Sequence, residues 1–395
     1  HTPDRHGAPM PYMGFIKDLQ AALHGVPLMA LGRITDPAEA DGILARGEAQ
    51  LIGMGRTLLA DPAWPNKARA GRTWDIRYCL SCNTCWGTIV TQQIPVACVN
   101  NPCVAHDNEV DFKPELADNL KRVVVIGAGL AGMEAAWIAA ARGHEVTVIG
   151  ASDEVGGKAR LRERLPGGET VSSVYDFQMV AAKRAGATLS LGRKATMEDV
   201  VALKPDRVIL ATGSRMIPPD WLPDGVRKED WVPDLRAALL DILRIETRQP
   251  GAVVLYDTDH TEATYAAAEA LAGRFARTVI VTPRDSVATD VPLVTRQGIL
   301  RRMAEHRIEI VSLAEPRWSD RAAEGQLELV NIYNGDITMI EDLVLLTYAT
   351  PRVPDDALAA PLRAAGIEVV LVGDARAPQE MLFATASGHA AGMAD

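Results

Sequence analysis

The sequence predicts an α/β protein with more than one domain. Short apolar runs typical of buried parallel strands alternate with stretches typical of helices. One of these runs leads through a glycine-rich turn into a helix, and another strand follows at the spacing of a nucleotide-binding fold. The length of 395 residues is enough for two or three domains.

The composition is that of an ordinary globular protein with an acidic balance. Hydrophobic residues make up 48% and charged residues 23% of the chain, and the formal net charge is −10. An acidic chain argues against a nucleic-acid surface, and no apolar run approaches the roughly 20 residues that a membrane span needs. The first residues lack the apolar core of a signal peptide. We therefore expect a protein of the cytoplasm that binds no nucleic acid and has no membrane span.

All five cysteines fall between Cys79 and Cys103, within 25 consecutive positions. Two residues separate Cys79 from Cys82 and Cys82 from Cys85, and twelve residues separate Cys85 from Cys98. Four thiolates in such an arrangement commonly hold an iron–sulfur cluster, whereas zinc sites usually show two separated pairs. The spacing favours a cluster over zinc or free buried thiols. Cys103 is expected to be a bystander.

Residues 1–73 are expected to form two βα repeats. Helix 15–23 precedes strand 26–31, a helix opens at Asp36 as N-cap with a proline after it, and strand 49–54 follows. Both strands run into a Gly-Arg pair, which suits a phosphate dianion as in the loops after the last strands of a (β/α)8 barrel. The alternative is two surface arginines near turns. The pairs are Gly32 with Arg33 and Gly55 with Arg56.

Residues 120–215 and 347–395 are expected to form a Rossmann-like domain, whose sheet includes strands 122–126, 145–149, 207–211 and 369–372. The first strand leads into the sequence Gly127-x-Gly129-x-x-Gly132, which opens a helix. Such glycines permit a tight turn and let a pyrophosphate approach the helix N-terminus. The alternative is a glycine turn in an empty domain. Gly150 stands where an acidic residue usually binds the ribose, with acids only three and four residues later.

Residues 216–346 are expected to form a second, nested nucleotide-type domain. Strand 252–256, helix 261–272 and strand 277–281 give it a βαβ outline. The loop from Asp257 to Glu262 has no glycine and carries two acids where a pyrophosphate would lie. Because like charges repel, we expect this domain to bind no NAD(P)H. The alternative is an atypical loop that still binds one.

These motifs, in this order, resemble the iron–sulfur relatives of Old Yellow Enzyme, which include trimethylamine, dimethylamine and histamine dehydrogenases and bacterial 2,4-dienoyl-CoA reductases. The resemblance covers nearly the whole chain, and its most specific part is the cysteine motif followed by Val99-Asn-Asn-Pro102. It implies that residues 1–73 are the last two βα units of an FMN-binding (β/α)8 barrel. Residues 74–119 would hold a [4Fe–4S] cluster, and the Rossmann-like domain would bind FAD or ADP.

The resemblance also implies which residues hold these cofactors. The strand-end pairs would bind the FMN phosphate, the cysteines the cluster, and the glycine loop with three later motifs the FAD or ADP. In that order the residues are Gly32, Arg33, Gly55 and Arg56; Cys79, Cys82, Cys85 and Cys98; Gly127, Gly129, Gly132, Gly156, Gly157, Thr212, Gly213, Gly373 and Asp374. The family's catalytic residues would lie in the six βα units that precede these two, so none is assigned in this chain.

Two branches of that family differ in how electrons enter. The reductase branch binds NADPH in the nested domain through glycines that this chain lacks, whereas the amine dehydrogenase branch passes electrons to a protein acceptor. Residues 330–335 also look more like the dehydrogenase branch. The resemblance therefore implies dehydrogenation or N-demethylation of a small amine or methylammonium substrate. Electrons would pass through FMN and the cluster to an electron-transferring flavoprotein or a similar carrier.

Other functions stay open at this stage. An NAD(P)H-dependent enoate or 2,4-dienoyl-CoA reductase shares the fold and the cofactors. A non-catalytic electron-transfer subunit that docks on a separate barrel subunit is another alternative. A structural remnant with empty sites fits less well, because four spaced cysteines are otherwise a liability to oxidation. We also expect a homo-oligomer.

Overall fold

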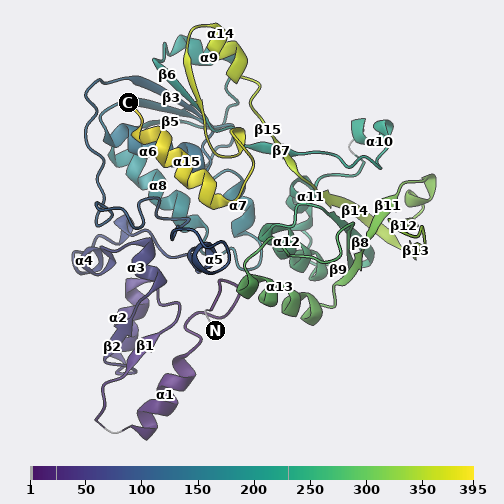
Figure 1. Cartoon of the computed structure of the whole chain (residues 1–395), viewed down its shortest axis with the longest axis horizontal. Helices are drawn as coiled ribbons and strands as arrows, with labels where there is room; N and C mark the ends of the chain where they lie inside the picture. Colours follow the sequence, from purple (N-terminus) through teal and green to yellow (C-terminus); the bar gives the residue numbers. More distant parts are fainter. Residues whose placement is uncertain (1–2, 24, 230) are drawn as a thin grey trace. The chain divides into compact units, whose positions relative to one another are not determined.

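The computed structural model describes residues 3–23, 25–229 and 231–395 (Figure 1). It divides into two compact α/β units. The first comprises His1–Arg160, Thr170–Ser214 and Pro354–Asp395, and the second comprises Leu161–Glu169 and Arg215–Val353. None of the described helices is long and apolar enough to cross a bilayer.

The first unit begins with the predicted βα repeats. Strands β1 (Met29–Leu31) and β2 (Leu51–Gly53) pair in parallel, and the Asp36 side chain caps helix α2 by accepting from the Ala38 amide at 2.7 Å. The helices of this part are α1 (Met13–Ala22), α2 (Pro37–Ala45), α3 (Arg56–Ala60) and α4 (Trp64–Arg69). The order of helices and strands confirms the prediction.

The apolar run at residues 26–31 predicts a buried parallel strand, and for most of β1 this prediction is wrong. Met29 and Leu31 of β1 are 47% and 46% exposed, and Leu51, opposite Met29 on β2, is 50% exposed. Only Ala30, which points to the other face of the strand, is buried. Within the described residues this sheet has two strands, so one of its apolar faces is left uncovered.

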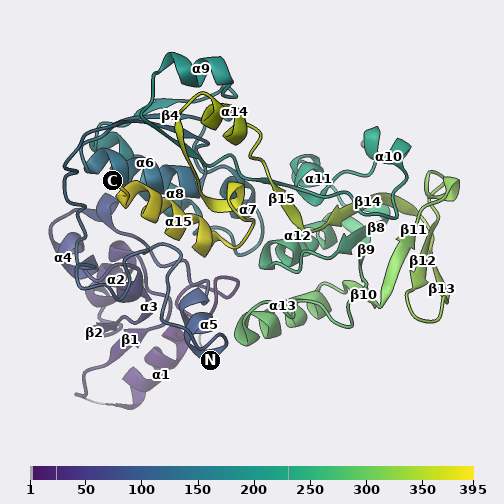
Figure 2. The same ribbon diagram turned by 45° about the horizontal axis from the view of Figure 1, so that its top comes forward.

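The rest of the first unit is a five-stranded parallel sheet in the order β16-β6-β3-β4-β5. Helix α6 follows the central strand β3 and packs between α8 and α15 (Figure 2). The predicted strands join one sheet as expected. The elements are β3 (Arg122–Ile126), α6 (Leu130–Ala141), β4 (Glu145–Ile149), α7 (Lys158–Glu163), α8 (Ser172–Arg184), β5 (Thr188–Ser190), α9 (Met197–Ala202), β6 (Arg207–Leu210), α14 (Ala359–Ala364), β16 (Glu368–Leu371) and α15 (Met381–Met393).

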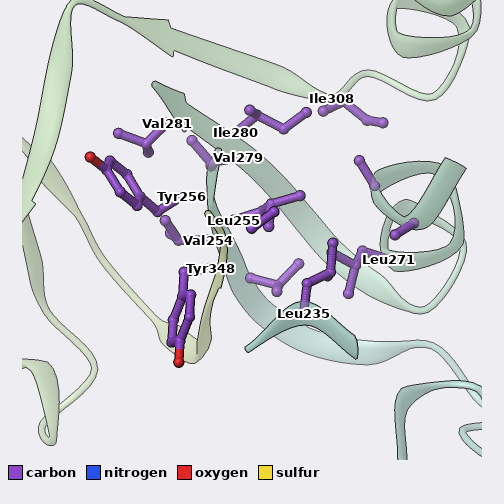
Figure 3. Packing of buried hydrophobic residues seen from close by; sticks show 14 of the residues in the cluster. Leu235, Val254, Leu255, Tyr256, Leu271, Val279, Ile280, Val281, Ile308 and Tyr348 are labelled. Atoms are coloured by element: carbon purple, nitrogen blue, oxygen red, sulfur yellow. The ribbon is translucent and has the colours of Figure 1, made fainter. Parts of the chain in front are cut away.

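The second unit is built on a four-stranded parallel sheet in the order β10-β9-β8-β14, with a small antiparallel sheet β11-β12-β13. Its apolar core gathers side chains such as Leu255, Ile280 and Leu271 (Figure 3). The main elements are α10 (Asp224–Lys228), α11 (Leu235–Ile242), β8 (Gln249–Asp257), α12 (Glu262–Ala272), β9 (Phe275–Thr282), α13 (Leu293–Glu305), β10 (Glu309–Ser312), β11 (Ala314–Arg317), β12 (Leu327–Asn331), β13 (Ile337–Ile340) and β14 (Leu343–Ala349). Strands β7 (Ser214–Met216) and β15 (Arg352–Pro354) carry the chain between units.

The second unit extends beyond the range 216–346 that the sequence suggested. Strand β14 pairs in parallel with β8, with Leu346 beside Val254 and Tyr348 beside Tyr256, so a boundary at residue 346 would cut a core strand. Residues 161–169 also belong to this unit, and Leu165 is part of its core.

Candidate cofactor sites

The four predicted cluster cysteines lie on a segment that links the βα repeats to the Rossmann-like sheet. Helix α5 (Thr84–Val90), which the sequence pattern did not predict, carries Cys85 in its first turn. Ser81 and Asn83 have left-handed backbones, with φ of 53° and 60°. Such residues turn the chain sharply, and here they alternate with the cysteines, so the thiols are presented from a tightly curled loop.

The thiols influence one another electrostatically. Burial raises the pKa of Cys79 to about 11, with smaller contributions from Cys82 and Cys85. Burial likewise raises the pKa of Cys85 and of Cys98, and neighbouring cysteines add to both shifts. Thiols of this kind become thiolates when a bound metal supplies positive charge.

The cysteine segment offers sulfur ligands of the kind that hold an iron–sulfur cluster. Among the residues that the structure describes, no three potential ligands lie close enough to share one metal ion. A [4Fe–4S] cluster places each thiolate on a different iron, so its four sulfur ligands do not have to meet at one point. The Ser81 amide also donates to Cys79 Sγ at 3.4 Å, a contact that suits a thiolate.

A buried ion pair fixes the start of the cysteine segment. Lys67 Nζ lies 2.7 Å from Asp61 Oδ2, and both side chains are almost inaccessible to solvent. Asp61 Oδ2 also accepts from the Arg77 amide at 3.0 Å, and Lys67 donates to the Asp75 carbonyl at 2.9 Å. Helix α4 and the residue that ends α3 are therefore tied directly to the residues that precede Cys79.

The structure brings the two Gly-Arg pairs to the same edge of the β1–β2 sheet, because parallel neighbours end side by side. Gly32 has φ of +99°, and a Cβ there would lie 2.6 Å from the Tyr12 ring. Arg33 donates to the backbone carbonyls of Gly7 and Ala8. Arg56, just after Gly55, donates to Asn83 Oδ1 in the cysteine segment, a link that sequence reasoning missed.

The glycine loop between β3 and α6 needs its three glycines for different reasons. A Cβ on Gly127, where φ is +107°, would lie 2.3 Å from the Ala211 carbonyl oxygen. A Cβ on Gly132 would lie 1.9 Å from the carbonyl oxygen of Gly127. A Cβ on Gly129 would meet no atom within 4 Å. The first and last glycines are therefore required for packing, and Gly129 borders open space that a pyrophosphate could fill.

Replacing Gly129 by alanine is expected to leave the fold intact and weaken nucleotide binding at least tenfold. The backbone at Gly129 has φ of −80° and ψ of −175°, which alanine adopts without strain. The new methyl group would occupy space at the helix N-terminus, where the phosphate charge is stabilised. Calorimetric titration with ADP measures the nucleotide affinity, and thermal unfolding checks that the fold is intact. An unchanged ADP affinity would contradict the assignment of Gly129 to the nucleotide site. Gly14→Ala, also in open space, is the control.

The remaining predicted nucleotide residues lie around the same loop. The Gly156 amide donates to the Ala128 carbonyl at 2.8 Å, and Gly157 lies against Gly129. Thr212 and Gly213 follow β6, and Gly373 and Asp374 follow β16, which places them at the carboxyl end of the sheet with Gly127. Asp374 Oδ2 accepts from the Ser214 hydroxyl at 2.6 Å. This is the edge at which parallel sheets bind ligands.

The missing acid at position 150 has a steric explanation. A Cβ on Gly150 would lie 2.7 Å from Leu191 Cδ2 and 3.0 Å from the Ala128 side chain. A carboxylate therefore has no room there. Glu154, four residues further on, is instead paired with Arg160 at 2.6 Å.

In the second unit, the side chain of the last residue of β8 binds the backbone of the loop that follows the strand. Asp257 is fully buried, and its Oδ1 accepts from the amides of Asp259 at 3.1 Å and His260 at 3.0 Å. Its Oδ2 accepts from the Tyr265 hydroxyl at 2.9 Å. The hydroxyl oxygen of Tyr265 in turn accepts from the Ala288 amide at 2.7 Å. The amides that could cradle a phosphate are thus already bound to a carboxyl group of the protein itself.

Two parts of the chain match known protein families: the region of the βα repeats and part of the Rossmann-like domain. Residues 12–75 match the family described as NADH:flavin oxidoreductase / NADH oxidase, and residues 125–181 match the NAD(P)-binding Rossmann-like domain. The NADH oxidase of Thermoanaerobacter brockii is 31% identical over 378 residues, which cover 92% of this chain and 54% of that protein. Residues 12–75 thus belong to the NADH:flavin oxidoreductase / NADH oxidase family, and the chain is similar to an NADH oxidase over most of its length.

Other members of this flavin oxidoreductase family act on different substrates. The dimethylamine dehydrogenase of Hyphomicrobium sp. (strain x) is 28% identical over 415 residues, covering 92% of this chain and 54% of the relative. A 2-naphthoyl-CoA reductase, solved with 2-naphthoyl-CoA, superposes with a TM-score of 0.87 at 25% identity and covers 100% of this chain and 58% of that one. The chain thus spans little more than half the length of these relatives. Family membership indicates a flavin cofactor.

Proposed function

We propose that this chain is part of an FMN and [4Fe–4S] oxidoreductase that dehydrogenates or N-demethylates a small amine or methylammonium compound. Its Rossmann-like domain would bind FAD or ADP, and electrons would leave to an electron-transferring flavoprotein or a similar carrier. The observation that carries the proposal is the closed loop after β8, where Asp257 occupies the amides of Asp259 and His260.

That loop bears on the direction of electron flow. A pyridine nucleotide that reduced the flavin would place its pyrophosphate at the carboxyl end of β8, against the buried Asp257 carboxylate. Burial raises the pKa of Asp257, and its carboxyl group already accepts from the amides of Asp259 and His260, so these amides are not available to a phosphate. Electrons would then have to come from the substrate, as the likeness to a dimethylamine dehydrogenase also suggests.

The role of this chain's residues would be to hold the cofactors. Bound flavin would supply two-electron chemistry, and the cluster would supply one-electron transfer. Arg33 and Arg56 would neutralise the FMN phosphate at the ends of β1 and β2. The four cysteines would hold the cluster on the segment that directly follows these strands.

A reductase fed by NAD(P)H is the second candidate, supported by the likeness to an NADH oxidase and a 2-naphthoyl-CoA reductase. A third candidate is an electron-transfer subunit that docks on a separate barrel subunit. The open face formed by Met29, Leu31 and Leu51 would suit further strands of a barrel, whether they belong to the same polypeptide or to another.

Anaerobic purification with iron and sulfide analysis, followed by addition of NADPH, tests the proposal. We expect about four irons per chain, the content of one [4Fe–4S] cluster, and no bleaching of the visible spectrum by NADPH. Dithionite, which needs no nucleotide site, serves as the positive control. Rapid bleaching by NADPH would move the protein to the reductase branch, and one zinc per chain would refute the cluster.

A further inference from the structure

Glu134 of α6 is a wholly buried carboxylate at the centre of a hydrogen-bonded chain. Its Oε1 lies 3.0 Å from Arg77 Nη2, and its Oε2 accepts from Gln178 Nε2 at 2.9 Å. His389 Nδ1 on α15 lies 3.4 Å from Oε1. A buried charge is costly unless it is paired, so each partner is held firmly in place.

One end of this chain reaches the cysteine segment. Arg77, two residues before Cys79, donates through Nη1 to the Asn100 carbonyl at 2.8 Å. The Asn100 side chain donates to the Tyr78 carbonyl at 2.9 Å. Asn100 follows Cys98 by two residues, so Arg77 joins the backbone near the first cysteine to the backbone near the last. Its guanidinium also lies 4.1 Å from the centre of the Phe177 ring.

The other end reaches the glycine loop. Gln178 Nε2 donates to the Leu130 carbonyl at 3.1 Å as well as to Glu134. Leu130 is the first residue of α6 and directly follows Gly129, which borders the open space of the nucleotide site. The path from Leu130 through Gln178, Glu134 and Arg77 to Asn100 is therefore continuous.

We infer that this path couples the two cofactor sites, so that a nucleotide at the glycine loop changes the environment and the retention of the cluster. The inference rests on the cofactors proposed above. Gln178, Glu134 and Arg77 act as positioning residues, because their hydrogen bonds run to protein groups beside the two sites and not to the cysteines or the loop glycines. A shift of the Leu130 carbonyl moves Gln178, and Arg77 cannot move independently without costing the buried Glu134 its shortest ion pair.

Coupling of this kind is reciprocal. If ADP binds more tightly when the cluster is present, the cluster must be held more tightly, by the same factor, when ADP is bound. Such coupling factors typically lie between about 5 and 150. We therefore expect ADP affinity to fall at least about fivefold when iron is removed.

The test measures ADP binding by calorimetry on the whole chain, freed of bound nucleotide, with its cluster and after iron chelation. Visible circular dichroism of the cluster, with and without ADP, reports on the same link. Glu134→Gln and Gln178→Ala should each abolish both effects. Arg184→Ala is the matched control, since Arg184 also joins α8 to the start of the segment, through Asp75, but at the surface. It should keep the wild-type coupling.

Equal ADP affinity of the cluster-bearing and iron-depleted wild-type protein would overturn the inference. Coupling that persists in Gln178→Ala would also overturn the inference. This variant removes the hydrogen bond to the Leu130 carbonyl without burying a new charge. A chain that holds iron and binds ADP without coupling refutes this inference alone. A chain that holds no iron or binds no ADP refutes the proposed cofactors and the inference with them.

Discussion

Replacing Cys98 by alanine is expected to remove nearly all of the iron from the anaerobically purified protein. Cys98 is the one predicted ligand that lies outside the curled loop of the other three, and burial raises the pKa of its thiol well above the ordinary value. Without this fourth ligand the cluster would be open on one side and would be lost. Iron and sulfide analysis with a visible spectrum measures the effect.

Cys103→Ala is the matched control for this prediction. Cys103 lies in the same segment and is only 3% exposed, but its sulfur lies 3.5 Å from His389 Nε2 on α15. Its removal should leave the iron content unchanged. Equal loss of iron in both variants would show that Cys98 has no special role, and an unchanged iron content in Cys98→Ala would refute its assignment as a ligand.

Replacing Lys67 by methionine is expected to destabilise the protein by about 3–5 kcal/mol, since it leaves the Asp61 carboxylate buried without its ion pair. Urea unfolding should show a clearly lower midpoint. Lys17→Met is the control, because Lys17 is 63% exposed and lies 3.8 Å from Glu48 in a surface pair. The loss there should be within about 0.5 kcal/mol. A Lys67 variant as stable as the control would contradict the structural role of the buried pair.

The Glu134 carboxyl gives an expected pH dependence. Burial alone would raise its pKa, but Arg77 and His389 lower it to about 2, below the ordinary value of 4.5. The stabilisation is therefore present above pH 4.5 and is lost as the pH falls from about 4.5 towards 2, by a few kcal/mol at most. Urea midpoints from pH 6 to pH 3 should fall less steeply in Glu134→Gln. Parallel curves would contradict the lowered pKa.

Much of the fold was predictable because local sequence patterns carry it. Strand β4 was predicted at its observed bounds, since buried parallel strands are continuous apolar runs. The Asp36 cap and the glycine loop were equally visible, because each depends on residues a few positions apart. The grouping of the nucleotide residues followed from the parallel order of β3, β6 and β16.

Features that depend on distant partners were not predictable. Nothing in the sequence near Gly150 indicates that Leu191 fills the place of the ribose-binding acid. The Arg77–Glu134 pair joins residues 57 positions apart in different segments. The acidic residues at the end of β8 could be read from the sequence. The hydrogen bonds from the loop amides to Asp257 could not, because they depend on how the backbone turns at His260, where φ is 54°.

The uncovered β1–β2 pair has a consequence for how the isolated chain behaves at high concentration. In the part of the chain that the structure describes, neither strand has a second neighbour, so each presents a free row of amides and carbonyls beside apolar side chains. Such edges template the addition of strands from other molecules. Self-association of the chain alone would therefore grow with concentration and without fixed stoichiometry. A discrete oligomer would be expected only once further strands cover this pair.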